Sequence, residues 1–265
     1  MSSNRKRLSA RLFLLKEMVL RDIRSRYAGS GLGVLWAFAQ PVLWMLLYTG
    51  VFEVILRVPV ENGFSGFPEF LLAGLLPWMA IQEGISRSSS ALTDNAAIVK
   101  KTVFPVETLV LSVVFAAIVN QVIAFVVFAA YVASVGHLSA GWLIFALPAL
   151  LLQALLMYGV GCFVATVVTF VRDAAQLVGI ALTVVFWATP IVYPIAMIPP
   201  RHGWLLAIVR ANPITHLVDW YRAAFSTHVA PSGISVLYLT LFSLLTALCG
   251  GALFAKARPH FADLM

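Results

Sequence analysis

Residues 106–135 read VETLVLSVVFAAIVNQVIAFVVFAAYVASV, and this stretch decides the fold. It carries a single charged side chain, Glu107. Because a helix needs about 20 mostly apolar residues to cross the hydrocarbon core of a bilayer, this stretch is long enough to span it. Outward from it, comparable apolar stretches predict six membrane-spanning helices, at residues 34–56, 67–85, 106–135, 142–171, 174–193 and 234–255.

The composition agrees with a membrane protein. Of the 265 residues, 61% are apolar and only 11% are charged. Soluble domains are about half apolar and about a quarter charged, so a soluble fold of this size could not cover itself with so few charges. Disordered, nucleic-acid-binding and disulfide-rich secreted proteins are also disfavoured. The sequence therefore predicts an all-α polytopic membrane protein with one domain over residues 1–265.

Cations gather on one side of the predicted spans. Eight of the 18 Lys and Arg residues lie in the first 26 positions. If both termini are cytoplasmic, 14 cations lie on the inner side and 4 on the outer side. Because short cytoplasmic loops are enriched in Lys and Arg, this imbalance predicts a multi-pass protein with both termini in the cytoplasm.

Residues 8–30 are predicted to form an amphipathic helix in the cytoplasmic interface. Apolar side chains from Leu8 to Tyr27 repeat at helical spacing, and most cations lie on the other faces. The stripe is interrupted by Lys16 and Arg26, so the amphipathic character is moderate. An ordinary juxtamembrane anchor is the alternative interpretation.

Two further segments stand outside the spans. Residues 93–105 lie between the second and third spans and are predicted to form a short cytoplasmic segment that could transmit force from a soluble partner. An ordinary solvated loop is the alternative interpretation. Residues 194–232 are largely apolar but are broken by five prolines and Gly203. Since each intervening piece is too short to span, this region is predicted to be a re-entrant helical hairpin at the outer face, with two helices lying on the outer leaflet as the alternative.

Several kinds of chemistry have no motif in this sequence. There is no Gly-Lys pair, so the phosphate-binding loop G-x-x-x-x-G-K-[ST] is absent, and there is no CxxC or H-E-x-x-H motif. We therefore expect no cofactor, no metal and no catalytic residue on this chain, and no binding to nucleic acid. No carboxylate lies in the middle of a predicted span, which disfavours an ion-coupled transporter.

Aromatic residues recur along two predicted spans. On the first span an aromatic or amide residue occurs every four positions, and the fifth span adds three more aromatic residues; the set is Trp36, Gln40, Trp44, Tyr48, Phe52, Phe186, Trp187 and Tyr193. Sugar rings present apolar faces that stack on aromatic rings, so this pattern favours a path for a glycan. The alternative is packing and the usual aromatic belts at the membrane interfaces.

Four stretches together resemble a known family. The sequence from Arg21 to Tyr27, RDIRSRY, is followed by Ser30, Leu32-Gly33, Leu35-Trp36 and Pro41. Later come Asn95 with Val99-Lys100-Lys101 and Phe104-Pro105, then TPIVYP at 189–194, then NPIT at 212–215 with Tyr221-Arg222. In this order they are similar to ABC-2 type permeases, the membrane subunits of bacterial O-antigen lipopolysaccharide, capsule and teichoic-acid ABC exporters.

The resemblance implies partners and residue roles. It implies a homodimer in the bacterial inner (cytoplasmic) membrane, with two separate ATP-binding subunits that hold ATP and Mg. It assigns coupling to Lys100, Lys101, Phe104 and Pro105, and a collar at the inner entrance to Arg21, Asp22, Arg24, Arg26 and Tyr27. It places Asn212, Pro213, Tyr221 and Arg222 at an outer gate, and the aromatic residues Trp36, Trp44, Tyr48, Phe52, Phe186, Trp187 and Tyr193 along the path.

The implied function is export of a lipid-linked polysaccharide, with O-antigen as the first choice. Capsule, teichoic acid, a small molecule or a lipid are the alternatives within the family. An ion-coupled transporter is the alternative outside it. The sequence does not distinguish the glycan or its length.

Overall fold

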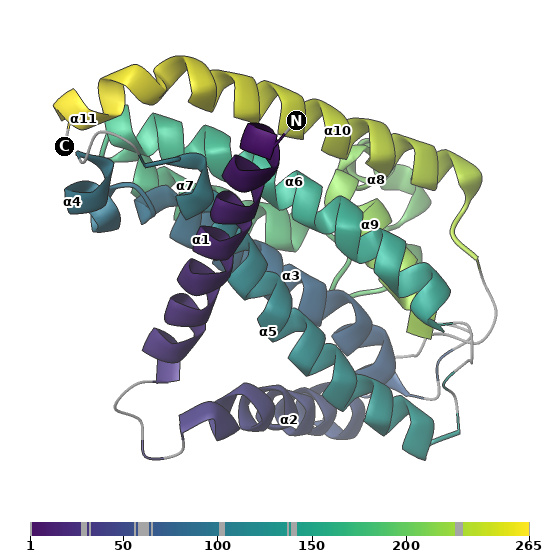
Figure 1. The fold of residues 1–265 in the computed structure, drawn as a ribbon. Helices are drawn as coiled ribbons and strands as arrows, with labels where there is room; N and C mark the ends of the chain where they lie inside the picture. The colour runs from purple at the N-terminus through teal and green to yellow at the C-terminus, as the bar shows by residue number, and fades with distance from the viewer. Residues whose placement is uncertain are drawn as a thin grey trace.

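The computed structural model describes residues 2–27, 31, 33–55, 57, 64, 66–100, 104–136, 138, 142–225 and 230–264. The regular secondary structure in these residues is entirely helical (Figure 1). The prediction of an all-α protein is therefore confirmed. Four long helices, α3, α5, α6 and α10, lie beside one another and form the body of the molecule.

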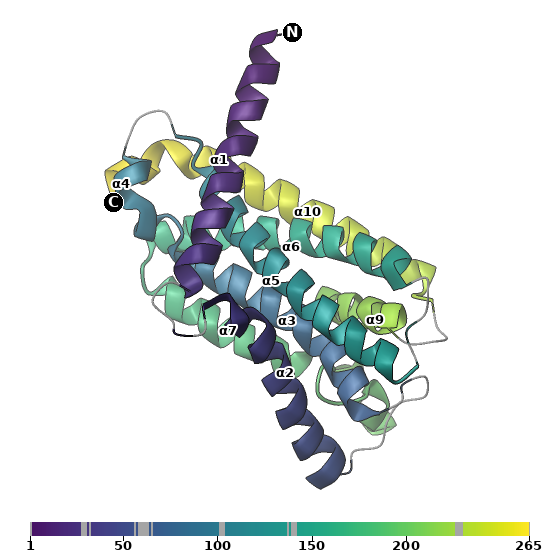
Figure 2. The ribbon, with the colours of Figure 1, turned by 60° about the horizontal axis from the view of Figure 1, so that its bottom comes forward.

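The chain begins with α1 (Ser2–Tyr27), and the N-terminal part of this helix projects away from the body (Figure 2). The helix therefore starts before residue 8, where the sequence places the start of the interface helix. Residues 28–30, the predicted end, lie outside the described residues. The C-terminal part of α1 packs along α5 (Glu107–Ser134).

The first predicted span changes its helix type along its length. It begins with the 3-10 turn η1 (Gly33–Leu35), continues as α2 (Trp36–Tyr48) and ends as the π-helix η2 (Thr49–Ile55). A π-helix is wider than an α-helix and is rare, and it is frequently found at functional sites. Pro41 lies inside α2, where it removes a backbone hydrogen bond.

The body is held together by closely packed apolar helices. α3 (Phe67–Ser90) contacts both α5 and α6 (Trp142–Phe170), while α6 has its most extensive contact with α10 (Gly233–Ala257). That contact depends on Gly159 and Gly250, because a Cβ atom on either would overlap the backbone of the opposite helix. Small residues at such crossings let membrane helices approach closely.

Three helical stretches among the described residues are long and apolar enough to cross a membrane: Glu107–Ser134, Trp142–Phe170 and Gly233–Leu264. The stretches Trp36–Phe52 and α7 (Ala174–Ala188) are apolar but shorter. α7 ends five residues before the predicted limit at 193, since Thr189 is extended and Pro190 cannot donate a helical hydrogen bond. The number of six spans therefore stays a prediction.

Two helices of unequal burial follow α7. After the 3-10 turns η4 (Ile195–Met197) and η5 (Pro200–His202), α8 (Gly203–Ala211) is largely exposed. In contrast, α9 (Pro213–Phe225) is mostly buried against α3, α6 and α10. The burial of α9 argues against two helices that both rest on a membrane surface.

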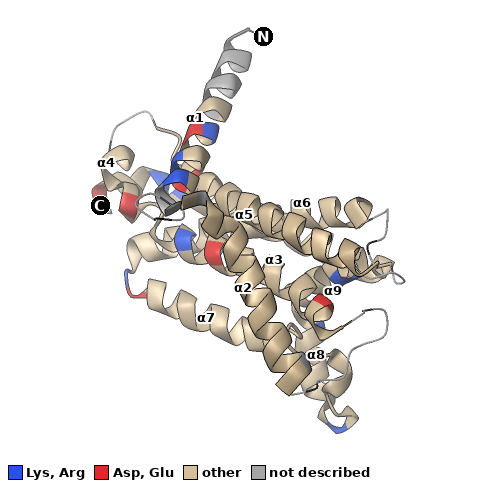
Figure 3. Cartoon of the chain, turned by 90° about the horizontal axis from the view of Figure 1, so that it is seen from below, with Lys and Arg blue, Asp and Glu red and all other residues tan. Residues whose placement is uncertain are grey.

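Charged side chains concentrate at one end of the body. Figure 3 shows Lys, Arg, Asp and Glu gathered around the C-terminal part of α1, α4 (Ala96–Val99) and the chain's C-terminus, with long uncharged stretches between there and α8. The C-terminal end continues from α10 through η6 (Arg258–His260) into α11 (Phe261–Leu264). This polarity agrees with the imbalance of cations on which the predicted topology depends.

Candidate functional site

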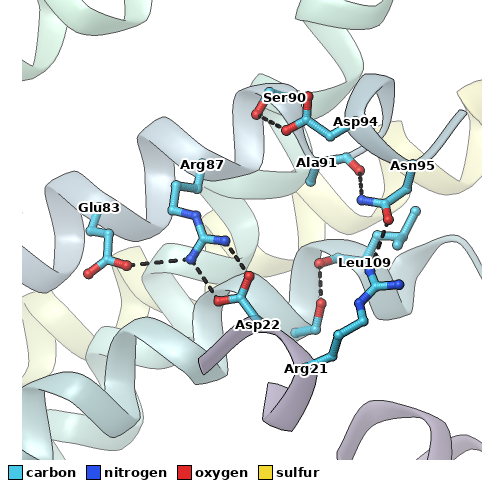
Figure 4. A network of polar contacts seen from close by, with 10 residues as sticks. Arg21, Asp22, Glu83, Arg87, Ser90, Ala91, Asp94, Asn95 and Leu109 are labelled. Carbon is cyan, nitrogen blue, oxygen red and sulfur yellow. Dashed lines mark hydrogen bonds and ion pairs between the residues drawn. The ribbon is translucent and has the colours of Figure 1, made fainter. Parts of the chain in front are cut away.

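The charged end contains a polar junction between α1 and α3, which we call the α1–α3 junction. It consists of Arg21 and Asp22 on α1, Glu83 and Arg87 on α3, and Asn95 in the 3-10 turn η3 (Thr93–Asn95) (Figure 4). Arg87 makes a two-point ion pair with Asp22, in which Nη1 donates to Oδ2 at 2.7 Å and Nη2 donates to Oδ1. Glu83 lies one turn before Arg87, with its Oε1 3.6 Å from Nη1.

A second contact joins α1 to the predicted coupling segment. Nη2 of Arg21 donates to Oδ1 of Asn95 at 3.1 Å, and Nδ2 of Asn95 donates in turn to the carbonyl oxygen of Ala91 at 2.9 Å. Ser90 donates to Asp94 at 2.7 Å and thereby secures the end of α3 to η3 (Figure 4). A movement of η3 would therefore reach α1 and α3 together.

The electrostatics of the junction favour a fixed charge state. The hydrogen bonds that Arg87 donates to the Asp22 carboxylate are the main reason why the pKa of Arg87 is raised above its ordinary value. The Asp22 side chain is 16% exposed and that of Arg87 is 36% exposed. A two-point Arg–carboxylate pair in this half-buried setting is stronger and more directional than a single exposed contact.

The predicted coupling residues lie at the same charged end. Lys100 is exposed at the end of α4, and Phe104 packs partly against the core. Pro105 is half-buried, and Lys101 lies outside the described residues.

The C-terminal end of the chain holds this segment in place. Arg258 donates from Nη1 to Oε1 of Glu107 at 3.0 Å and from Nη2 to the carbonyl oxygen of Phe104 at 3.5 Å. In the same C-terminal turn, Phe261 is buried and its ring contacts that of Phe254. The predicted coupling segment is thus fixed on one side by α1 and on the other by the C-terminal turn.

Of the predicted collar residues, Arg21 and Asp22 belong to the junction. Arg24 is exposed on α1, and the side chains of Arg26 and Tyr27 lie outside the described part of the structure. The structure therefore brings two of these five residues into one cluster with Arg87 and Asn95.

The aromatic side chains of the first span divide into two groups. Trp44 stacks on Tyr48 with ring centroids 5.5 Å apart, and the series continues through Phe52 to Phe67 at the start of α3. Trp36 is 40% exposed and lies with Trp44 along a cavity between α2, α3 and α5. Tyr48 and Phe52 therefore pack on the body, while Trp36 and Trp44 line the cavity.

The aromatic residues of α7 form a separate group. Phe186 contacts Trp78 of α3 and Trp187, and Trp187 is 61% exposed. The hydroxyl of Tyr193 donates to the carbonyl oxygen of Trp187 at 3.0 Å, which folds the segment after α7 back on its end.

The predicted outer-gate residues organise the start and the buried face of α9. Asn212 accepts from the backbone N–H of Ile214 at 3.0 Å and donates from Nδ2 to the hydroxyl of Thr189 at 2.8 Å. Pro213, the first residue of α9, suits a helix start because its missing N–H needs no partner there. The hydrogen bond from Asn212 to Thr189 fixes the start of α9 to the end of α7.

Tyr221 and Arg222 lie inside the protein, where they attach α9 to three other elements. The Tyr221 hydroxyl donates to Oε1 of Gln153 at 2.7 Å, and Gln153 exchanges two hydrogen bonds with Gln121. Arg222 donates to the carbonyl oxygens of Phe70 (3.3 Å) and Ile191 (2.9 Å), and its guanidinium lies 3.6 Å from the ring centroid of Phe70.

Several residues that carry these contacts were not predicted from the sequence as site residues: Arg87, Gln121, Gln153 and Arg258. Gln121 and Gln153 could have been predicted from the sequence, because an amide inside an apolar span must find a hydrogen-bond partner. Nothing in the sequence indicated the contacts of Arg87 and Arg258, since their carboxylate partners lie 65 and 151 positions away in the chain. Within the described residues, no group of three His, Cys, Asp or Glu side chains could hold a metal ion.

Comparison with known proteins places this arrangement in a family. The family model for ABC-2 type transporters matches residues 14–226, which include the junction, the cavity and α9. The chain belongs to the ABC-2 type transporter family. As an ABC-2 chain it is a multi-pass membrane permease subunit, the non-catalytic component of its transporter.

Relatives resemble this ABC-2 permease over almost its whole length. An O-antigen export system permease protein, RfbA of Klebsiella pneumoniae, is 31% identical over 95% of both chains. RfbA of Myxococcus xanthus is 29% identical over 94% of both chains. The polysialic acid transport protein KpsM of Escherichia coli is 26% identical over 91% of this chain and 92% of that protein.

Proposed function

We infer that this chain is the permease subunit of an ATP-driven exporter that moves a lipid-linked polysaccharide, O-antigen, outward across the bacterial inner membrane. The observation that carries this proposal is the likeness to O-antigen export permeases along 94–95% of the chain. Capsule export is the second candidate, because the polysialic acid transporter is also similar over most of the chain.

The geometry supports a division of labour in which ATP-binding subunits act on the charged end. Two such subunits, holding ATP and Mg, would contact α1 and the segment 93–105 of a permease homodimer with both termini in the cytoplasm. The contacts Asp22–Arg87, Arg21–Asn95 and Arg258–Glu107 join these surfaces to α3 and α5. Movement of the ATP-binding subunits would thereby reach the helices that line the cavity.

The outward faces suit this setting. α7 and α10 expose rows of large apolar side chains, with Ile180 and Val184 on α7 and Leu241, Leu245 and Leu248 on α10 all more than half exposed. Such rows are suited to lipid or to a second copy of the chain, and they would be costly in water.

The test is reconstitution with and without the partner. Purified alone, the chain should hydrolyse no ATP; with its ATP-binding subunit in proteoliposomes it should support hydrolysis and carry lipid-linked O-antigen to the opposite leaflet. In cells, depletion of the chain should leave the lipid-linked glycan on the cytoplasmic side. ATP hydrolysis by the chain alone, or normal surface glycan after depletion, would overturn the proposal.

A further inference from the structure

The C-terminal turn, which consists of η6 and α11, contacts the predicted coupling segment 93–105 at two points. α11 lies beside α4, and Arg258 of η6 donates to the carbonyl oxygen of Phe104 near the end of the segment (Figure 1). We propose that this turn positions the segment for its contact with an ATP-binding subunit, and that Arg258 is the positioning residue. This inference rests on the proposed function and adds to it a part of the chain that lies far from the segment in the sequence.

Three elements meet at Arg258. This residue caps the C-terminal end of α10, its Nη1 donates to Oε1 of Glu107 at 3.0 Å, and its Nη2 lies 3.5 Å from the carbonyl oxygen of Phe104. Glu107 is in the first turn of α5, so the guanidinium reaches across the point where the segment becomes α5. A planar guanidinium can serve two acceptors at once. One side chain therefore holds the end of the segment, the start of α5 and the end of α10 in a single arrangement.

The C-terminal turn is itself anchored to the body. Phe261 of α11 is fully buried, and its ring centroid lies 5.1 Å from that of Phe254 on α10. α11 also contacts α6, and α6 has its most extensive contact with α10. A displacement of the coupling segment would therefore reach α10 and α6 through the turn, in addition to α5 through the chain itself.

The ion pair between Arg258 and Glu107 is suited to positioning rather than to stabilising the fold. The side chains are 42% and 30% exposed, and exposed ion pairs contribute little to folding. Each charge is also favourable without the other, because Glu107 lies at the positive end of the α5 dipole and Arg258 at the negative end of the α10 dipole. Loss of the pair should therefore leave both helices folded while it releases the end of the segment.

The first test measures whether Arg258 holds the segment in the full-length chain alone, by hydrogen exchange and mass spectrometry in lipid nanodiscs. The peptide 104–110 reports it, because the backbone N–H groups of Thr108 and Leu109 close the first turn of α5. In Arg258→Gln this peptide should exchange about threefold faster or more, while the peptide 213–225 of α9 exchanges as before. An unchanged rate at 104–110 would overturn the proposal.

The second test measures coupling in proteoliposomes that contain the chain and its ATP-binding subunit. The quantity is the ratio of lipid-linked O-antigen exported to ATP hydrolysed. This ratio does not depend on the amount of folded protein, so a purely structural role of Arg258 would leave it unchanged. Arg258→Gln should lower the ratio about threefold or more, because a released segment moves without carrying α5 and α10 with it. A ratio equal to that of the unsubstituted complex would overturn the positioning role.

Further variants test whether the two residues act as one pair. Glu107→Gln should lower the ratio as much as Arg258→Gln, and the double variant should lower it no further, because each change removes the same contact. Arg258→Lys keeps a positive charge opposite Glu107 and should retain most of the coupling. Lys256→Gln is the matched control, because Lys256 is an exposed cation in the last turn of α10 that takes no part in either contact. Losses that add in the double variant, or an equal loss in the control, would contradict the assignment.

The outcome is separable from that of the proposed function. If the unsubstituted complex exports no lipid-linked O-antigen, the proposed function falls, while hydrogen exchange in the chain alone still decides whether Arg258 holds the segment. If the unsubstituted complex exports and Arg258→Gln exports with the same ratio, the proposed function stands and the positioning role falls.

Discussion

The charged end and the region around α9 hold their helices together in opposite ways. At the α1–α3 junction, Asp22 and Arg87 form an ion pair between half-buried side chains, and Arg21 and Asn95 make an exposed contact. Around α9, Arg222 is 6% exposed and Tyr221 is fully buried, and each of them binds groups on other helices. The difference suggests that α9 is a fixed part of the body, while α1 and η3 are joined to it by contacts that can break and re-form.

The two sets of contacts should respond differently to salt. Mobile ions screen exposed charges strongly and partly buried ion pairs less, whereas they do not reach hydrogen bonds inside the protein. The ion pair at the junction contributes little free energy to folding, because water competes for its charged groups. If ATP-binding subunits act on the charged end, as proposed above, exchangeable contacts there would let α1 and η3 move relative to the body.

The largest effect is expected from Arg222→Ala. The change removes the hydrogen bonds to the carbonyl oxygens of Phe70 and Ile191 and the contact with the Phe70 ring, and it leaves a cavity. We expect the free energy of unfolding to fall by about 3 kcal/mol. Urea unfolding in detergent micelles, followed by tryptophan fluorescence, measures this loss.

The matched control for this change is Arg210→Ala, at the exposed end of α8. It should alter stability by less than about 0.5 kcal/mol. If the two variants unfold at the same urea concentration, α9 is not fixed by Arg222. The proposed contrast between the two regions would then fail at α9.

A smaller effect is expected at the α1–α3 junction. Asp22→Asn and Arg87→Gln should each cost about 1 kcal/mol, and the double variant should cost less than their sum because both remove the same ion pair. Raising the salt concentration to about 1 M should reduce this coupling, because the Arg87 side chain is partly exposed to the solvent. The same urea experiment, repeated with all four proteins, measures it.

Glu17→Gln is the control on α1, because Glu17 is exposed on the same helix as Asp22. It should change stability little at either salt concentration. A coupling energy that salt leaves unchanged would mean that the junction is as rigid as the contacts of α9. The proposed distinction between the two regions would then be lost.

The sequence contains the helices but not the contacts between them. The predicted spans 106–135 and 142–171 differ from α5 and α6 by one residue at most at each end, because long apolar runs with defined breaks fix helix limits directly. α7 is shorter than predicted, since the apolar pattern continues past Pro190 although the helix does not. The hydropathy of a stretch indicates that it is apolar, whereas the residue at which this helix ends depends on backbone geometry.

The site could be predicted only where its residues are near each other in the chain. The four-residue spacing on the first span indicated an aromatic face, and Trp36 and Trp44 do line the cavity. The Asp22–Arg87 pair and the contact of Tyr221 with Gln153 join residues 65 and 68 positions apart. Periodicity within one helix holds no information about which helix lies opposite, so such pairs need the tertiary structure.

The smallest effect on stability, and a large one on transport, is expected from Lys100→Glu combined with Lys101→Glu. Lys100 is exposed at the end of α4, so reversing its charge removes no buried contact, and unfolding should change by less than about 0.5 kcal/mol. If the segment receives force from an ATP-binding subunit, the variant complex should still hydrolyse ATP while export falls at least tenfold. Proteoliposomes in which ATP hydrolysis and export are both measured separate the two rates. Lys256→Glu at the end of α10 is the control, because Lys256 is also exposed and lies at the same charged end. Export that survives the double change would remove the coupling role from these lysines, whereas loss of both export and stability would mean that the charged end is part of the rigid body after all.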